Sequence, residues 1–165
     1  MNELKQFKSR SDLKEIIEKL EKHFARPVNP GNHPTIYKDS VDSKYRTVMG
    51  VRINDYKFSP DEKWVLPDDQ MGLSFSSTWK NLKDVHRLMT RGTDKAGLPK
   101  VADIYWVLQG ADIPENMKFV EDRDPKKNGH YFLTVTKMMK VSMLVSNLKW
   151  IADRMSVIKD GGRAI

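Results

Sequence analysis

The chain contains no cysteine in its 165 residues, so disulfides, thiol nucleophiles and thiolate zinc sites are excluded. No apolar run approaches the length of about 20 residues that a membrane-spanning helix needs. The first residues, Met1–Lys5, are polar and charged, which is not typical of a signal peptide. We therefore expect a cytoplasmic protein with no membrane partner.

Several short signatures of catalytic and metal sites are also missing. The phosphate-loop and dinucleotide glycine fingerprints are absent, and so is the Gly-x-Ser-x-Gly elbow of hydrolases. Neither Asp112 nor Asp122 has a partner at metal-ligand spacing, and no two of the four histidines form a short ligand pair; these are His23, His33, His86 and His130. We therefore expect no metal site.

The composition is that of a folded and basic protein. Apolar residues make up 39% of the chain, so wholesale disorder is excluded, and the length suits a core of ordinary size. Lysine and arginine total 29 against 22 acidic residues, which gives a formal charge of +7. Such a charge favours binding to polyanions such as RNA, DNA, phosphorylated cofactors or an acidic protein, although it also serves solubility alone.

The N-terminal part of the sequence predicts a helix over residues 11–25, followed by a connector. Ser11 is an N-cap candidate, and an apolar stripe at helical spacing runs as far as Phe24. Three prolines and a glycine then follow within residues 26–35. We therefore divide the chain into an N-terminal helical extension and connector, residues 1–35, and a main domain, residues 36–165.

The rest of the chain predicts strands and two further helices, which is an α+β pattern. Helices are expected over residues 79–90, capped by Ser77 or Thr78, and over residues 138–158. The expected strands, in chain order, are residues 45–53, 64–66, 72–76, 101–108, 117–120 and 130–136.

The strand that opens with His130 and Tyr131 is the most informative of these. Alternation places Tyr131 on the same face as Leu133, and His130 on the opposite face with Phe132. A strand entry that carries a titratable and an aromatic side chain is a candidate edge of a site. The alternative is an ordinary hairpin with a capping aromatic ring.

Three groups of side chains on separate strands are candidates for chemistry. Arg46 is suited to gripping a phosphate, and the hydroxyls of Ser76, Ser77 and Thr78 to bonding a ribose or an amide. His130 and Tyr131 would supply a proton acceptor or a stacking ring. Each also has a structural interpretation, namely a solvated arginine, a helix cap and a packed histidine.

Taken together, five pieces of the sequence resemble the toxin domain of the second type VI secretion effector of Pseudomonas. That family is similar in fold to ADP-ribosyltransferases of the diphtheria-toxin and exotoxin kind. The resemblance covers roughly residues 44–155, and its specific part is Gly-x-Asp-Ile-Pro with the later His-Tyr pair. The pieces are Tyr45–Val48, Gly72–Leu73, Ser77–Thr78, Gly110–Asp122 and His130–Tyr131.

The resemblance implies a split, mixed or antiparallel β core of ADP-ribosyltransferase type, with flanking helices and NAD, as substrate, in the cleft. Arg46 would hold the pyrophosphate or the neighbouring ribose, and His130 would bond a ribose hydroxyl or orient the acceptor. Tyr131 would stack on nicotinamide. The nicotinamide-side ribose would be bonded by hydroxyls at Ser77 and Thr78, with Ser76 as a third candidate.

The family's late-strand glutamate has no certain counterpart here, since Glu121 and Asp122 are only the nearest carboxylates. The function implied is that of a bacterial toxin that transfers ADP-ribose to a cytoplasmic acceptor, with RNA or DNA among the possible acceptors. An acidic antitoxin or immunity protein would restrain it.

Two alternatives belong to other classes of function. One is a basic ribonuclease toxin that does not use NAD, with His130 or His86 as general base and Arg46 for the phosphate. The other is a nucleic-acid-binding module without catalysis.

Overall fold

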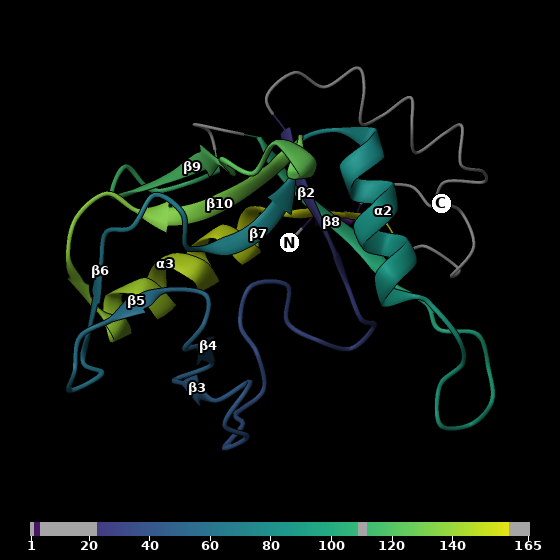
Figure 1. The fold of residues 1–165 in the computed structure, drawn as a ribbon, viewed down its shortest axis with the longest axis horizontal. Coiled ribbons are helices and arrows are strands. Elements are labelled where there is room, and N and C mark those ends of the chain that lie inside the picture. Colours follow the sequence, from purple (N-terminus) through teal and green to yellow (C-terminus); the bar gives the residue numbers. More distant parts are fainter. Residues whose placement is uncertain (1, 4–22, 109–111, 159–165) are drawn as a thin grey trace.

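The computed structural model describes residues 2–3, 23–108 and 112–158, which form a mixed α+β fold (Figure 1). The expected α+β class is confirmed at this level, with largely antiparallel sheets and two α-helices in the described residues. Within those same residues, no helix is long and apolar enough to cross a membrane.

A seven-stranded sheet forms the centre of the described structure. Its strand order is β1-β12-β8-β2-β7-β10-β9, and all neighbours are antiparallel except β1 and β12. The bounds are β1 Asn2–Glu3, β2 His23–Val28, β7 Leu73–Ser76, β8 Asp103–Leu108, β9 Met117–Glu121, β10 His130–Val135 and β12 Ser156–Ile158.

Two smaller sheets complete the β structure of the described residues. Strands β11, β6 and β5 form one, and β3 pairs with β4 in a separate hairpin. Their bounds are β3 Thr47–Val48, β4 Val51–Arg52, β5 Lys57–Phe58, β6 Trp64–Leu66 and β11 Met139–Lys140.

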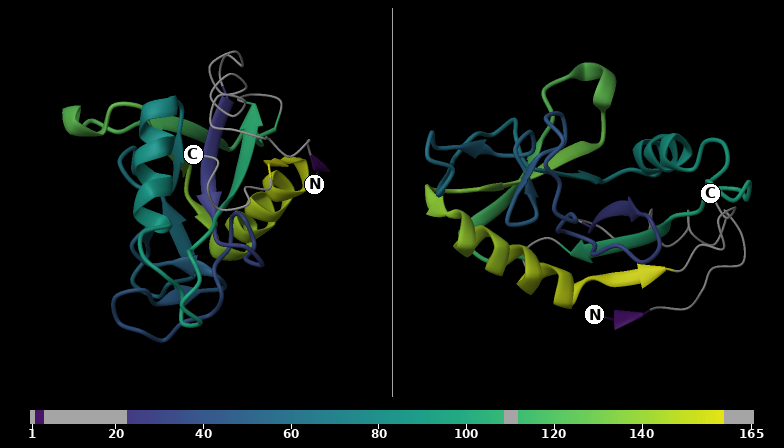
Figure 2. Two further views of the ribbon diagram at one scale, coloured as in Figure 1. Left: turned by 90° about the vertical axis from the view of Figure 1, so that its right-hand side faces the viewer. Right: turned by 90° about the horizontal axis from the view of Figure 1, so that it is seen from below.

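The two α-helices lie on opposite sides of strands β2 and β8 (Figure 2). Helix α2, Trp79–Met89, begins where the hydroxyl of Thr78 accepts a hydrogen bond from the N–H of Asn81. Helix α3, Val141–Arg154, packs one apolar face into the core; its buried residues include Leu144, Leu148 and Ile151. A short 3-10 helix, η1, spans Pro125–Lys127.

Three expectations about secondary structure need correction. The helix predicted over residues 11–25 is wrong for residues 23–25, which lie in β2, and the rest of it falls outside the described residues. Strand β2 pairs with both β7 and β8. The expected N-terminal extension, residues 1–35, therefore contributes a strand to the main sheet. The helical spacing of the apolar residues does not decide the structure here, because residues 23–28 form hydrogen bonds with a strand on each side.

The other two corrections concern residues 45–53 and 138–158. The first is a hairpin and not one strand, because Met49 and Gly50 adopt positive φ angles of 54° and 84° and turn the chain between β3 and β4. The segment 138–158 begins with strand β11 and not with a helix. Its helix, α3, ends at Arg154, and the following residues form β12, which pairs with β8. The remaining expected strands and the helix at 79–90 are confirmed to within a few residues.

A tight junction joins strand β10 to the chain around Gly72. The hydroxyl of Tyr56 donates to the carbonyl oxygen of Leu133 at 2.7 Å and accepts from the N–H of Leu73 at 3.4 Å. Gly72 has a φ of +156°, and a Cβ built on it would lie 2.7 Å from the carbonyl carbon of Leu133. Only a residue without a side chain therefore fits at position 72, against the backbone of β10.

Candidate functional site

Strands β7 and β10 bring several of the predicted site residues together at one end. His130 lies opposite Ser76 in the ladder, and the N–H of Ser77 donates to the carbonyl of Gly129 at 2.8 Å. Ser77 also donates its hydroxyl to that same carbonyl at 3.3 Å, while buried Ser76 donates to the side chain of Asn81. The predicted proximity of the hydroxyls to His130 is therefore present, although each serine bonds to the protein itself.

Thr78 and Tyr131 also have structural partners. Thr78 is the N-cap of α2, a role that contributes about 1 kcal/mol to stability. Tyr131 meets Phe24 edge to face at 5.0 Å between ring centroids, against the hydrophobic core. Their roles toward NAD stay predictions.

His130 forms a close pair with Asp122, the residue that follows β9. Its Nδ1 lies 2.7 Å from the Asp122 carboxylate, and the two side chains are only 13% and 10% exposed. Burial opposes ionisation of Asp122, but hydrogen bonds from the N–H of Asp124 and from His130 outweigh it and lower its pKa. A histidine oriented by a carboxylate is a recurring arrangement for proton transfer.

Arg46 lies apart from this group, because it precedes the β3–β4 hairpin, which Figure 1 shows well away from the facing ends of β7 and β10. Its guanidinium makes a bidentate ion pair with Glu62, in which Nη1 donates to Oε1 at 3.0 Å and Nη2 donates to Oε2. The pair raises the pKa of Arg46 and lowers that of Glu62. The structure thus does not bring Arg46 together with Ser77 and His130.

We expect Arg46→Ala and Glu62→Ala to behave alike, because each removes the same surface ion pair. Both should lower the melting temperature slightly, and both should leave NAD binding within about twofold of the parent. The measurement is a thermal melt beside a calorimetric NAD titration for each variant and for the double variant. Loss of binding in Arg46→Ala alone would instead support the phosphate role that the resemblance implies.

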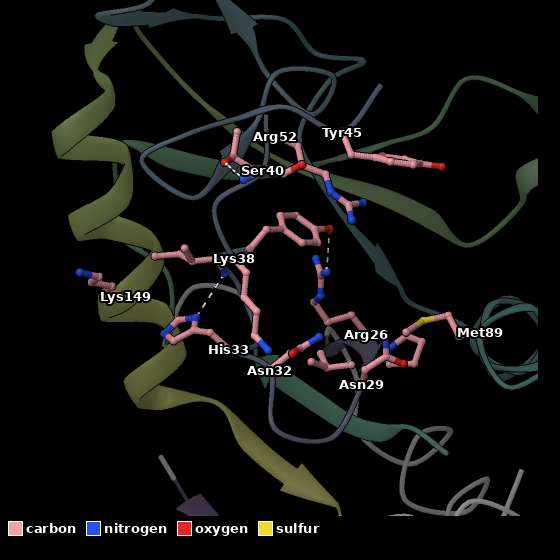
Figure 3. Close-up of a pocket in the computed structure, with 15 residues that line it drawn as sticks. Arg26, Asn29, Asn32, His33, Lys38, Ser40, Tyr45, Arg52, Met89 and Lys149 are labelled. Carbon is pink, nitrogen blue, oxygen red and sulfur yellow. Dashed lines mark hydrogen bonds between the residues drawn. The ribbon is translucent and has the colours of Figure 1, made fainter. Parts of the chain in front are cut away.

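A pocket of about 740 Å³ lies elsewhere, beside strand β2 (Figure 3). Its walls come from β2, the segment after it, the β3–β4 region, the end of α2 at Met89 and helix α3 at Lys149. The volume falls in the range of small-molecule and cofactor sites. None of the predicted site residues, Arg46, Ser76, Ser77, Thr78, His130 and Tyr131, lines it.

The charged side chains that line this pocket are all cationic. They are Arg26, Lys38, Arg52 and Lys149, and no aspartate or glutamate is among the lining residues. His33 lines it as well, but burial and the neighbouring Lys149 lower its pKa, so it is neutral near pH 7. The pocket is therefore suited to an anion.

Tyr37 holds two of these cations in place. Arg26 donates to its hydroxyl at 3.3 Å and to the carbonyl of Ser74 at 3.3 Å. Arg52 lies over its ring at 3.8 Å and near the ring of Tyr45 at 4.9 Å. Two fixed guanidinium groups can donate hydrogen bonds to the phosphate oxygens of a ligand, and the two tyrosine rings beside them can contact a flat ring of the same ligand.

Asp55 is a carboxylate that interacts electrostatically with both Arg26 and Arg52. Burial raises the pKa of Asp55, and the opposing attraction of Arg26 and Arg52 does not cancel that effect. Since the folded-state pKa is raised, the stability that Asp55 contributes is present below its ordinary value of 3.8 and is lost as the pH rises through the folded pKa.

We expect Asp55→Asn to raise the melting temperature at pH 7, because it removes a charge that is costly to bury. The gain should shrink as the pH falls toward 3.8, where the native side chain also becomes neutral. Inorganic pyrophosphate should bind the variant a few-fold more tightly, because Arg26 and Arg52 lose an opposing charge. Melts over a pH series and a pyrophosphate titration measure both effects.

Asp61→Asn is the matched control, with the opposite sign. Hydrogen bonds from the Ser59 hydroxyl and the Lys63 N–H lower the pKa of Asp61, so its contribution to stability is present at neutral pH and lost in acid. This variant should melt lower at pH 7 and bind pyrophosphate as the parent does. A gain in stability from both variants would show that net charge, and not burial at Asp55, is responsible.

The pocket was missed from the sequence because Arg26 fell in the expected connector, residues 26–35, and Arg52 within one expected strand, residues 45–53. A Pro-Gly segment flanked by arginine and tyrosine was the available signal. In the part of the chain that the structure describes, no group of three or more potential metal ligands is found. Comparison of the chain with models of known protein families, with curated proteins and with solved structures finds no match.

Proposed function

We propose that the chain binds NAD in the pocket around Arg26 and Arg52 and transfers ADP-ribose to an acceptor, as an NAD-dependent ADP-ribosyltransferase of the glycosyltransferase class. The observation that supports this best is the pocket itself, which has four cationic lining residues, two tyrosine rings and no carboxylate among its lining residues. The proposal includes the ADP-ribosyltransferase type of fold, which the α+β architecture allows.

The chemistry of the ligand matches the pocket's side chains. The pyrophosphate of NAD carries two negative charges, which two arginine forks bind well. Its adenine and nicotinamide rings are flat and suit contact with Tyr37 or Tyr45. Ser77, which follows β7, and His130, which opens β10, do not line the pocket, so the roles that the resemblance implies for them stay separate predictions.

The proposed reaction breaks the bond between nicotinamide and C1 of its ribose. The bond's electron pair leaves with nicotinamide, which becomes neutral, and the ribose passes through a cationic transition state. A nucleophilic atom of the acceptor then bonds to C1 and loses a proton. Such a step needs placement and electrostatic stabilisation more than a covalent nucleophile on the protein.

Labelled NAD tests this function. The purified chain is incubated with adenylate-labelled NAD and bacterial extract, and transfer of label to protein, RNA or DNA is followed together with release of nicotinamide. We expect label transfer, and we expect growth arrest when the chain is produced in a bacterium without a neutralising antitoxin or immunity protein. Absence of both NAD binding and nicotinamide release would overturn the proposal.

A ribonuclease that does not use NAD is a second candidate, which the His130–Asp122 pair favours. The carboxylate orients a histidine of low exposure at the end of β10, as a general base requires. His86 is a weaker base candidate because it is buried. RNA shortening without NAD, lost in His130→Ala, would support this function, and the absence of both reactions would leave a binding module.

A further inference from the structure

The segment from Arg87 to Lys100 forms an exposed projection, which we call the basic arm. It comprises the end of α2 and the loop that follows, and Figures 1 and 2 show this loop at the rim of the molecule. All ten residues from 91 to 100 are exposed. Leu88 and Leu98 are 63% and 62% exposed, so this segment presents two apolar side chains to solvent.

The loop of the basic arm is ordered by its own hydrogen bonds. Asp94 accepts the N–H groups of Ala96 and Leu98 on one carboxylate oxygen, at 2.9 and 3.0 Å, and its own N–H donates to the carbonyl of Leu98 at 2.8 Å. Thr93 and Pro99 form an antiparallel bridge. A preorganised loop loses little conformational entropy when it binds a partner.

The basic arm also concentrates positive charge. It contains four cations, Arg87, Arg91, Lys95 and Lys100, against one carboxylate, so its net charge is 4 − 1 = +3. That carboxylate, on Asp94, is turned inward to the loop's N–H groups. The arm therefore presents cations and two leucines to its surroundings.

The basic arm begins beside the pocket. Met89, in the last turn of α2, lines the pocket and directly follows the exposed Leu88 of the arm. A macromolecule that binds the arm would therefore also lie next to the mouth of the pocket. Figure 3 shows Met89 on α2 at one side of the pocket, opposite Lys149 on α3.

We propose that the basic arm is the docking surface for an acidic segment of a partner protein, whose apolar side chains cover Leu88 and Leu98. The bound segment closes the pocket at Met89. The docking does not depend on the proposed function. The closure of the pocket rests on the proposed function, because it is measured through NAD binding.

Two features favour a protein over a nucleic acid as the occupant. Two exposed leucines offer an apolar contact that a partner's own leucine, valine or phenylalanine would bury. The arm has no aromatic residue, so it lacks the rings on which single-stranded bases stack. The four cations then supply fast, salt-dependent association with carboxylates.

The test uses the full chain and a fluorescent peptide of alternating glutamate and leucine pairs. We expect the peptide to bind in an anisotropy titration, and we expect Leu88→Ser with Leu98→Ser to weaken binding about tenfold. Arg91→Ser with Lys95→Ser should weaken it about as much and reduce its dependence on salt. Saturating peptide should lower NAD binding by the parent chain.

Lys57→Ser with Lys63→Ser is the matched control, since it removes two exposed cations from the β5–β6 hairpin. Its peptide affinity should stay within about twofold of the parent. Equal weakening in this control, equal binding of a glutamate–serine peptide, or tighter binding of a polyuridine RNA would each overturn the docking proposal. Peptide binding that leaves NAD binding unchanged would overturn the closure alone, and a chain that never binds NAD would overturn the proposed function alone.

Discussion

Alanine at Arg26 or Arg52 is expected to weaken NAD binding by about 10- to 100-fold, the largest effect on function that the structure predicts. The estimate corresponds to the loss of one charge-assisted contact, about 1.5–3 kcal/mol. The NAD affinity of Arg52→Lys should lie between that of the parent and that of Arg52→Ala, because an ammonium keeps the charge but cannot repeat the flat contact with Tyr37. Calorimetric titration of each variant with NAD measures the losses.

Arg154→Ala serves as the control for the loss of one stacked arginine. Arg154 lies over the ring of Trp150 at 3.4 Å at the end of α3, and it does not line the pocket. Its replacement removes the same charge and the same kind of ring contact, so NAD binding should not change. If Arg26→Ala and Arg52→Ala bind NAD as the parent does while melting normally, NAD does not lie in this pocket.

The largest expected loss of stability comes from Gly72→Ala, at about 3 kcal/mol or more. The added Cβ would overlap the carbonyl of Leu133, and the backbone of β10 cannot move away because Tyr56 bonds that same carbonyl. A positive φ at this position adds backbone strain for any residue with a side chain. Chemical denaturation measures the free energy of unfolding.

Gly31→Ala separates backbone strain from overlap. Gly31 also has a positive φ, of 84°, but nothing lies within 4 Å of the place where its Cβ would be. It should therefore cost only about 1 kcal/mol, the strain of a left-handed residue. Equal losses in the two variants would mean that β10 yields at Leu133, contrary to the tight junction described above.

The sequence identified the elements whose signals are local. Helix α2 has its cap at Thr78 and a strong amphipathic pattern, and strands β9 and β10 alternate on either side of a polar loop, so each was predicted close to its observed bounds. Local periodicity carries this kind of information well.

The sequence did not identify what depends on distant pairing. Phe24 continues an apolar stripe at helical spacing, yet it lies in β2, because β7 and β8 offer hydrogen bonds on both edges. Arg26 gains its place in the pocket from that same pairing. Arg46 resembles a phosphate-binding arginine by its neighbours in the chain, but its partner Glu62 follows only after a hairpin turn. No window of adjacent residues contains these contacts.

The placement of β2 between β7 and β8 also decides when the pocket is made during synthesis. Arg26 and Arg52 leave the ribosome early, but β2 has no neighbour in the sheet until β7 has emerged, and Lys149 follows on α3. Contacts between residues so distant in the chain slow folding, and at about 5–20 residues per second the wait lasts several seconds. A nascent chain that stops before α3 lacks one wall of the pocket, so the complete pocket forms only after α3 has been synthesised.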